Sequence, residues 1–358
     1  MKNNKKILEF KSFAKNFRAD DRIAIVYDSD PDGLSSAVIA SKAIERLRGN
    51  APEAVFFQSH SIVSLQDSTL QKLKEHKINK LIVLDLAVDQ DAKQVKKAEK
   101  FLYLLVLDHH KTYKNISSKK TVFLKANEFS FLDPSKYATA KLAFDLFSEV
   151  VDISDLKWVA CVGLIGDCSL RAWKKFFDET YKETMTSEKE LRSLVELVSS
   201  VETVNRPKIG ELYKEFFNAK KPGDLKNSKF KNYKSIVQKE LQKLSEEFHQ
   251  KKEIFPEQEL VFFSFKSKFD IKSILVNNIS SKFYPDKTVV IVEDKGHGIM
   301  TLSARRQDFK VKMNDLLENS VKGLKGAMAG GHIPAAGGKI DKKDFKKFKE
   351  NIIKNLGK

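Results

Sequence analysis

The chain of 358 residues is long enough for two domains, each with its own hydrophobic core. Hydrophobic residues make up an ordinary 41% of it, and no apolar run is long enough to span a membrane. The net charge of +17 favours a polyanionic partner, although a lysine-rich solvated surface would give the same value. Lysines near the start are not followed by an apolar signal segment, so we expect a cytoplasmic protein without membrane attachment.

Strand and helix patterns alternate regularly through the first half of the chain. After an amphipathic helix within residues 1–20, apolar runs predict strands at 23–27, 54–58, 81–84, 101–107 and 121–124. Between and after them, helices are predicted at 34–47, 66–76, 90–100, 137–150 and 158–166, the last with Ser154 as its N-cap. Strands separated by helices imply parallel crossovers, so residues 1–177 are predicted to form an α/β domain with a parallel sheet.

The strand pattern disappears over residues 178–255, where helix formers alternate with charges. We interpret this segment as a helical connector. Residues 256–358 then predict a second, smaller α/β domain. Its expected elements are strands at 260–265, 289–293 and 299–304, helices at 271–283 and 311–317, a glycine-rich stretch at 326–338, and a basic terminal helix from residue 341 onward.

Acids and imidazoles follow several elements of the first predicted domain. They are Asp28, Asp30 and Asp32 after the first strand, Asp85 after the third, Asp108, His109 and His110 after the fourth, and Asp167 after the helix at 158–166. Ligands bind at the carboxyl edge of open α/β sheets. Because no basic residue stands beside these acids in the sequence, they would repel one another unless divalent cations held them. The pattern therefore predicts a two-metal site.

The ligand types indicate which cations this site would hold. Carboxylate oxygens favour Mg²⁺ or Mn²⁺, and an added imidazole moves the preference toward Mn²⁺. The acidic segment at 28–33 also resembles the start of a calcium-binding EF-hand loop. That loop needs a glutamate at its twelfth position, where this chain has Ile39. The calcium loop is therefore excluded.

A second group of candidate ligand-binding residues lies in the C-terminal domain. Gly330 and Gly331 would let backbone N–H groups approach a phosphate, and His332 could donate to it. The alternative is an ordinary flexible loop. Arg305 and Arg306 end a predicted strand and could clamp a phosphate, and strand alternation favours Arg305 as the one that points inward.

Together these motifs resemble the DHH phosphoesterase superfamily, in the branch with a C-terminal DHHA1 domain. That branch includes RecJ-type single-strand exonucleases and oligoribonuclease/phosphoadenosine-phosphate phosphatases. The resemblance covers essentially the whole chain. It rests on D-S-D-P-D-G at 28–33, Asp85, D-H-H at 108–110, Asp167, and G-G-H-x-x-A-A-G at 330–337.

The resemblance implies a role for each of these residues. Asp30, Asp32, Asp85, His109 and Asp167 would hold two Mn²⁺ ions, or Mg²⁺, with Asp85 between them; Asp28, where many members have histidine, would be a further ligand. Asp108 would orient the site, and His110 would contact the scissile phosphate. Arg305, Gly330, Gly331 and His332 would hold the substrate, with closure of the two domains completing the site.

The implied activity is a phosphodiesterase that releases nucleoside 5′-monophosphates from single-stranded DNA or RNA, with replication or repair proteins as further partners. The net charge and 26 phenylalanines favour this exonuclease. The alternative is hydrolysis of short oligoribonucleotides, phosphoadenosine phosphate or cyclic dinucleotides, because the extra oligonucleotide-binding domain of long RecJ enzymes is not evident. A non-catalytic replication scaffold is a third interpretation, which the intact set of acids disfavours.

Overall fold

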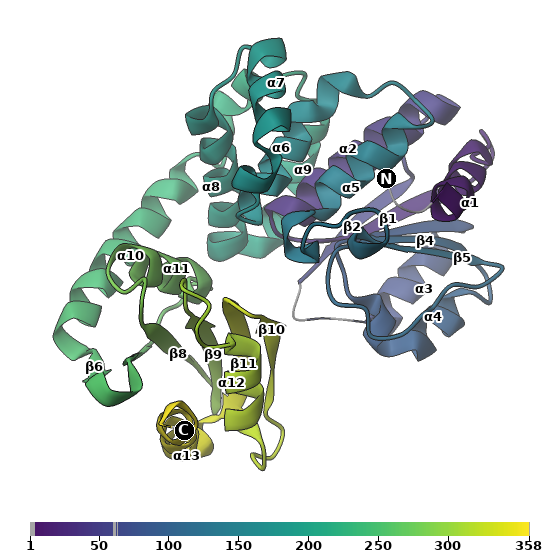
Figure 1. The fold of residues 1–358 in the computed structure, drawn as a ribbon. Helices are drawn as coiled ribbons and strands as arrows, with labels where there is room; N and C mark the ends of the chain where they lie inside the picture. Colours follow the sequence, from purple (N-terminus) through teal and green to yellow (C-terminus); the bar gives the residue numbers. More distant parts are fainter. Residues whose placement is uncertain (1–3, 60–61, 63, 358) are drawn as a thin grey trace. The chain divides into compact units, whose positions relative to one another are not determined.

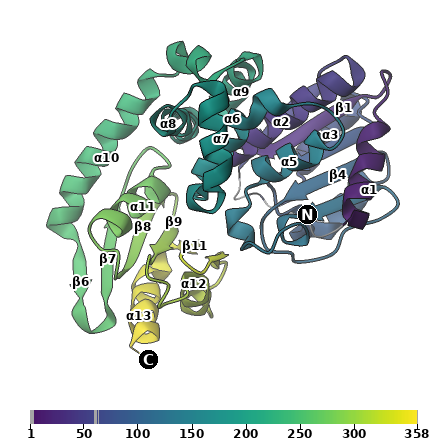
Figure 2. The same cartoon turned by 45° about the horizontal axis from the view of Figure 1, so that its top comes forward.

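The computed structural model describes residues 4–59, 62 and 64–357, and these divide into two compact units, residues 1–234 and 235–358 (Figures 1 and 2). Each unit contains one β-sheet with helices packed against it. In the described part of the chain, no helix combines the length and the apolar character needed to cross a membrane.

The first unit is built on a five-stranded sheet in which all neighbouring strands are parallel, in the order β2-β1-β3-β4-β5. The strands are β1 (Ile23–Asp28), β2 (Ala54–Gln58), β3 (Lys80–Leu84), β4 (Tyr103–Asp108) and β5 (Thr121–Lys125). This confirms the predicted fold class. The chain runs from β1 outward to β2 and then returns past β1 to β3. At such a reversal the loops leave in opposite directions, and a ligand site can form at the carboxyl ends of the strands.

Alternation along the strands builds a separate core on each face of this sheet. Ile25 and Leu84 belong to the core on one face, whereas Val26 and Val83 belong to the core on the other. The first face is covered by α1 (Asn4–Lys15), α2 (Pro31–Arg48), α5 (Thr139–Ser148), α6 (Lys157–Gly166), α7 (Lys174–Thr184), α8 (Glu188–Asn205) and α9 (Ile209–Asn218). The second face is covered by α3 (Asp67–Glu75) and α4 (Ala92–Ala98).

The starts of α2 and α6 differ from the sequence prediction for identifiable reasons. Helix α2 begins at Pro31 rather than at residue 34, because Asp30 caps its N-terminus and proline is favoured in the first helical turn. The prediction of Ser154 as an N-cap was wrong. Its side chain makes no capping bond, and its backbone N–H instead donates to Asp152 Oδ1 at 3.0 Å, which forms a short turn ahead of α6.

The segment interpreted as a connector is helical throughout most of its length. Helices α7, α8 and α9 contribute to the core of the first unit, with Leu191, Val198 and Phe216 among its buried residues. Helix α10 (Asn232–Lys251) follows, and the boundary between the two units falls within it.

The second unit has a six-stranded mixed sheet in the order β10-β11-β9-β8-β7-β6, in which only β7 and β8 pair in parallel. Its strands are β6 (Glu253–Phe255), β7 (Leu260–Phe265), β8 (Thr288–Gly296), β9 (Ile299–Arg305), β10 (Met328–His332) and β11 (Ala335–Asp341). Its helices after α10 are α11 (Lys272–Lys282), α12 (Met313–Val321) and α13 (Phe345–Leu356). Helices α12 and α13 share one hydrophobic core with the sheet.

The glycine-rich stretch forms a β-hairpin, which sequence patterns did not predict because glycine is a weak strand former. Close pairing explains two of the glycines. A Cβ on Gly331 would lie 2.5 Å from the Ala335 carbonyl oxygen, and one on Gly338 would lie 2.5 Å from that of Met328. The alternative of a loop without regular structure is therefore wrong.

Substitution of Gly163 in α6 tests whether the helices that cover the first sheet need their close packing. A Cβ there would lie 2.5 Å from Ala140 Cβ and 2.6 Å from Asp32 Oδ1. We expect Gly163→Ala to lower the free energy of unfolding by about 1–3 kcal/mol. In the control Gly210→Ala, the added Cβ meets the Phe57 ring at 3.7 Å, so a neutral or slightly stabilising effect is expected. Urea denaturation would measure the free energy of unfolding of both variants, provided that their m-values are unchanged. Equal stability of Gly163→Ala and Gly210→Ala would contradict the prediction.

Candidate metal centre

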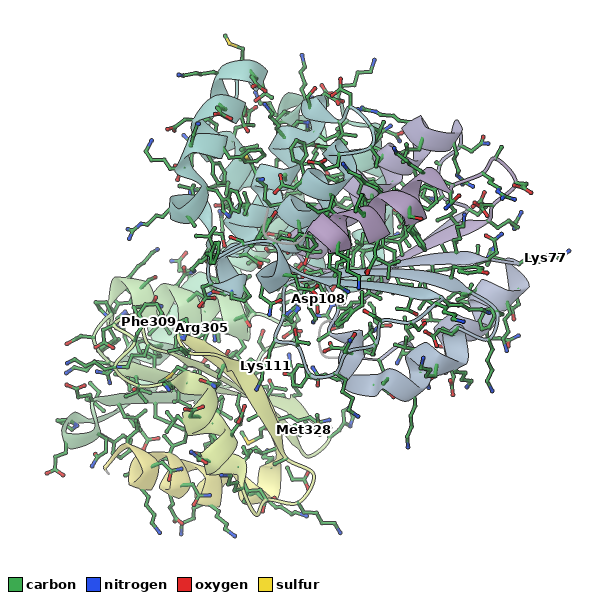
Figure 3. All side chains as sticks on the ribbon, turned by 45° about the vertical axis from the view of Figure 1, so that its right-hand side comes forward. Lys77, Asp108, Lys111, Arg305, Phe309 and Met328 are labelled. Atoms are coloured by element: carbon green, nitrogen blue, oxygen red, sulfur yellow. The ribbon has the colours of Figure 1, made fainter. Side chains whose placement is uncertain are left out.

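All the predicted metal ligands lie in the first unit, where the structure brings them together. Asp28 ends β1, Asp85 follows β3, and Asp108, labelled in Figure 3, ends β4. Three overlapping groups have ligand atoms within 4.8 Å of one another: Asp28, Asp30 and Asp85; Asp32, His109 and Asp167; and Asp85, His109 and His110. β1 and β3 are the strands between which the strand order reverses, so the cluster lies at the switch point of the sheet.

The acidic segment after β1 folds directly into the first turn of α2. Asp30 Oδ1 accepts the Gly33 N–H at 2.8 Å, and Pro31 occupies the first helical turn. A Cβ on Gly33 would lie 2.1 Å from the Asp28 carbonyl oxygen, so only glycine allows the helix to start this close to the strand. Because of this tight turn, Asp28, Asp30 and Asp32 all lie where the end of β1 meets the start of α2.

Asp32 is held by the N-terminus of a second helix. Its two carboxylate oxygens accept the N–H groups of Thr139 and Ala140, at 2.7 and 2.8 Å, in the first turn of α5. These N–H groups have no partner within the helix, and the helix dipole favours a negative charge there. Each oxygen keeps a second lone pair, which is what a metal ligand needs.

Asp85 lies at the centre of the cluster. It adopts a left-handed backbone conformation with φ of 60°, which is strained for a residue other than glycine. Its N–H donates to the Leu107 carbonyl oxygen at 3.0 Å, and its Oδ1 accepts the Thr139 hydroxyl at 2.8 Å. Buried strain of this kind, held by specific hydrogen bonds, is typical of functional positions.

The orientation of His109 points to a cation. Its Nδ1 lies 3.3 Å from the Pro134 carbonyl oxygen, which can only accept, so Nδ1 carries the proton in this bond. Nε2 is then the ring nitrogen that faces the acids, and it lies 3.4 Å from Asp85 Oδ1 and 3.3 Å from Asp167 Oδ2. Metal-binding histidines are commonly oriented in this way by a bond from their other nitrogen. A cation placed among these three groups would be ligated by Nε2 and by both carboxylates.

The pKa values of several acids in the cluster are raised by burial and by the charges of neighbouring carboxylates. Burial raises the pKa of Asp28, Asp30 and Asp32 well above the usual range, and the charges of neighbouring acids raise it further. Burial also raises the pKa of Asp167. Among the described residues, Asp28 Oδ1 and Asp167 Oδ2 are buried and accept no hydrogen bond. Hard oxygen donors in this state fit a divalent cation such as Mn²⁺ or Mg²⁺.

Asp108 is neutralised by two cationic groups. Its Oδ1 lies 2.7 Å from His110 Nδ1, and its Oδ2 accepts from Lys125 Nζ, which also lies 3.3 Å from Asp89 Oδ1. Burial opposes its ionisation, but His110 and Lys125 together hold the pKa of Asp108 below the usual range. Burial also opposes a charged His110, but Asp108 raises the pKa of this ring to about 10. The pair therefore holds His110 as an imidazolium.

The expectation that no basic residue neutralises the acids was therefore wrong at Asp108. Lys125 ends the neighbouring strand β5, 17 residues away along the sequence, and its side chain is buried. Sequence analysis also missed Thr139 and Glu202. Glu202 Oε1, on α8, accepts the Ser29 hydroxyl at 2.7 Å. Glu202 could not be identified from a local pattern, because α8 carries several other charged residues. Thr139 could not be identified either, because it lies at the start of α5, far from Asp85 in the sequence.

The predicted substrate-binding residues lie in the second unit. Arg305 ends β9, and its guanidinium donates to Asn277 Oδ1 at 2.7 Å and to the Ala336 carbonyl oxygen at 3.3 Å. Arg306 is buried and paired with Asp308 and Glu259, so its guanidinium is part of the fold. Gly330 and Gly331 lie in β10, and a Cβ on Gly330 would meet nothing within 4 Å. The side chain of His332 lies outside the described residues.

Comparison with protein families defines the class of this α/β protein. The model of the DHH family, N-terminal domain, matches residues 22–163, and the model of the DHHA1 domain matches residues 259–358. The chain therefore belongs to the DHH/DHHA1 superfamily, whose members are largely metal-dependent phosphoesterases, and the resemblance seen in the sequence is confirmed. A search of curated proteins finds no match.

Solved structures share this fold at low sequence identity. A DHH-domain protein described as a member of the s1p family of ribosomal proteins has a TM-score of 0.76 and 15% identity, with 99% of this chain and 90% of that chain covered. RecJ from Thermus thermophilus, in complex with Mn²⁺, has a TM-score of 0.72 and 17% identity, covering 98% of this chain and 55% of that one. An exonuclease RecJ bound to manganese has a TM-score of 0.67 and 16% identity, with 99% and 95% covered.

The raised pKa values predict how metal affects stability. The unfolded chain releases carboxyl protons near pH 4, whereas the metal-free folded cluster keeps them to higher pH. The metal-free protein therefore loses stability as pH rises, and metal binding, which needs deprotonated carboxylates, offsets this loss. We expect the difference in Tm between Mn²⁺-loaded and EDTA-treated protein to grow from about pH 5 to about pH 8.

Thermal unfolding at a series of pH values would measure this difference. Asp167→Asn should weaken its pH dependence, because it removes one of the raised carboxyls. Asp91→Asn is the control: Asp91 caps α4 by accepting the Gln94 N–H, and asparagine can do the same. A Tm difference that is independent of pH in the unmodified protein would contradict the prediction.

Proposed function

We propose that this protein is a metal-dependent phosphodiesterase of the RecJ-like exonuclease kind, which hydrolyses single-stranded DNA or RNA to nucleoside 5′-monophosphates. The observation that carries the proposal is the convergence of buried acids on His109 Nε2. Single-stranded nucleic acid is the proposed partner, in keeping with the +17 charge. Replication or repair proteins are further proposed partners, on the family resemblance alone.

Asp28, Asp30, Asp32, Asp85, His109 and Asp167 would hold two cations, with Mn²⁺ favoured by the imidazole. When bound, such a pair lowers the pKa of a coordinated water and stabilises negative charge on phosphoryl oxygens. The chain's own groups then position the phosphate.

His110 is the residue suited to the phosphate itself. Asp108 fixes the orientation of the His110 ring through Nδ1, so a phosphate contact from this side chain would be made by Nε2. Lys125 and Asp89 fix Asp108 from the other side. Asp89 Oδ2 also accepts the backbone N–H groups of Tyr113 and Lys114, which anchors the loop after the histidines. Arg305, Gly330, Gly331 and His332 are the proposed substrate-binding residues of the second unit.

The alternative function is hydrolysis of short oligonucleotides, phosphoadenosine phosphate or cyclic dinucleotides. The DHH and DHHA1 domain models match residues 22–163 and 259–358, and both proposed activities would use the same metal-binding acids. A non-catalytic scaffold has no need of the complete acidic cluster, so we do not favour it.

Replacing the central acid tests the catalytic proposal. Asparagine tolerates the left-handed backbone of Asp85 but removes its charge, so Asp85→Asn should lower Mn²⁺-dependent hydrolysis about a hundredfold or more without unfolding the protein. The control Asp91→Asn should keep full activity. Labelled single strands from dimers to about forty nucleotides would serve as substrates. Unchanged activity in Asp85→Asn would refute the proposed site, and a rate confined to the shortest strands would establish the alternative function.

The positive charge generates a separate prediction about long substrates. If lysines contact the phosphate backbone, they displace counterions, and binding should weaken steeply as salt rises. We expect the logarithm of the association constant for a long single strand to fall linearly with the logarithm of salt concentration, and that for a dinucleotide to change little. Fluorescence anisotropy would measure both. If the affinity for a long strand does not depend on salt concentration, the lysines do not contact its phosphates and are only part of the solvated surface.

A further inference from the structure

A strained, exposed aromatic residue lies between β9 and α12 in the second unit. Phe309, labelled in Figure 3, is 58% exposed. Its ring makes no aromatic contact with any residue that the structure describes. Its φ of 61° is a left-handed conformation that bulky side chains rarely adopt. A large apolar ring held outward at the expense of backbone strain suggests a binding function, because glycine or asparagine would satisfy the fold better.

The loop that carries Phe309 is clamped by a buried arginine. Arg306, only 1% exposed, donates from Nε to Asp308 Oδ1 at 2.7 Å and from Nη1 to the Thr288 hydroxyl at 3.2 Å. Asp308 Oδ1 also accepts the Lys310 N–H at 3.0 Å. Phe309 lies between the two ends of this clamp, so its outward orientation is fixed by the fold.

Both ends of the loop are tied to the turn of the glycine-rich hairpin. The Arg306 N–H donates to the Pro334 carbonyl oxygen at 3.1 Å, and the Met313 N–H donates to that of Ile333 at 2.8 Å. Phe309 is therefore presented next to the hairpin that contains the proposed substrate-binding glycines. A strand held at the hairpin would have this ring within reach of its next nucleotides.

Exposed positive charge follows Phe309 along the chain. Lys310, Lys312 and Lys322 line a groove of about 780 Å³ beside α12, with Asp315 as the acid among its lining residues. Neither Lys310 nor Lys312 makes an ion pair with a described residue, and both are exposed. The hydrogen bonds of Arg306 lower the pKa of Asp308 and Glu259, and the charge of Lys310 lowers both further without an ion pair to either. An exposed aromatic ring followed by exposed ammonium groups matches the chemistry of a single nucleic-acid strand, which offers a base to stack and phosphates to neutralise. An acidic peptide would use the lysines but not the flat ring.

We propose that Phe309 is a stacking platform for a base of single-stranded nucleic acid, and that Lys310 and Lys312 bind the adjoining phosphates. This inference rests on the proposed function and names its substrate class: a strand that extends beyond the nucleotides held at the hairpin.

Substitution of Phe309 tests the platform without endangering the fold. Phe309→Gly should keep or raise Tm, because glycine accepts the left-handed backbone, yet it should weaken binding of a 20-nucleotide strand about tenfold. Binding of a dinucleotide should be unchanged. Phe309→Tyr should bind as the unmodified protein does, whereas Phe309→Leu, which is apolar but not aromatic, should behave like glycine. Phe283→Ala, which removes a ring that is 49% exposed at the end of α11, is the matched control and should have no effect.

Binding would be measured by fluorescence anisotropy on the full chain in EDTA, so that no hydrolysis is needed. Replacing Lys310 and Lys312 by glutamine should reduce the salt dependence of long-strand binding, by roughly 0.7 in the log–log slope for each phosphate that a lysine no longer neutralises. Full long-strand affinity in Phe309→Gly, or in Phe309→Leu, would overturn the platform. A loss of binding in Phe309→Gly, when the unmodified protein hydrolyses no strand with Mn²⁺, would support the platform while rejecting the proposed exonuclease.

Discussion

The first unit gathers buried carboxylates that its fold compensates only in part. Burial raises the pKa of Asp28, Asp30, Asp32 and Asp167, and Nε2 of His109 faces two of the surrounding carboxylates rather than a donor. Buried carboxylates without donors are costly in any fold. Divalent cations would convert this repulsion into ligation, and metal binding would then contribute to the stability of the unit.

Close packing of the surrounding elements keeps the acids at this distance. Gly33 lets α2 begin against the backbone of Asp28, and Gly163 lets α6 approach Asp32 and α5. A Cβ on Gly166 would lie 2.9 Å from Pro31 Cβ, so this glycine brings the end of α6, and with it Asp167, next to the start of α2. The N-terminus of α5 then holds Asp32 through two backbone N–H groups. The glycines act by bringing elements together, rather than by contacting a ligand.

Different acids in the same cluster have different electrostatic surroundings. Asp108 is paired with Lys125 and His110 and stays ionised, whereas Asp28 and Asp167 have buried oxygens without donors among the described residues. This difference separates an acid that orients a histidine from acids suited to ligate a cation. In the second unit, the two adjacent arginines divide in a similar way: Arg306 supports the fold from inside, and Arg305 lies at the end of β9 beside the glycine-rich hairpin.

The sequence by itself determined the parallel α/β fold class and the positions of the acids, because apolar strands and the polar residues that follow them are local patterns. It could not supply Lys125, Thr139 or Glu202, which reach the cluster from other elements and have no distinctive neighbours. It also missed the glycine-rich hairpin, since glycine is a weak strand former and these residues become strands only by pairing, β10 with β11 and β11 with β9. The tertiary structure decided which acids are neutralised, because that depends on contacts between residues far apart in the chain.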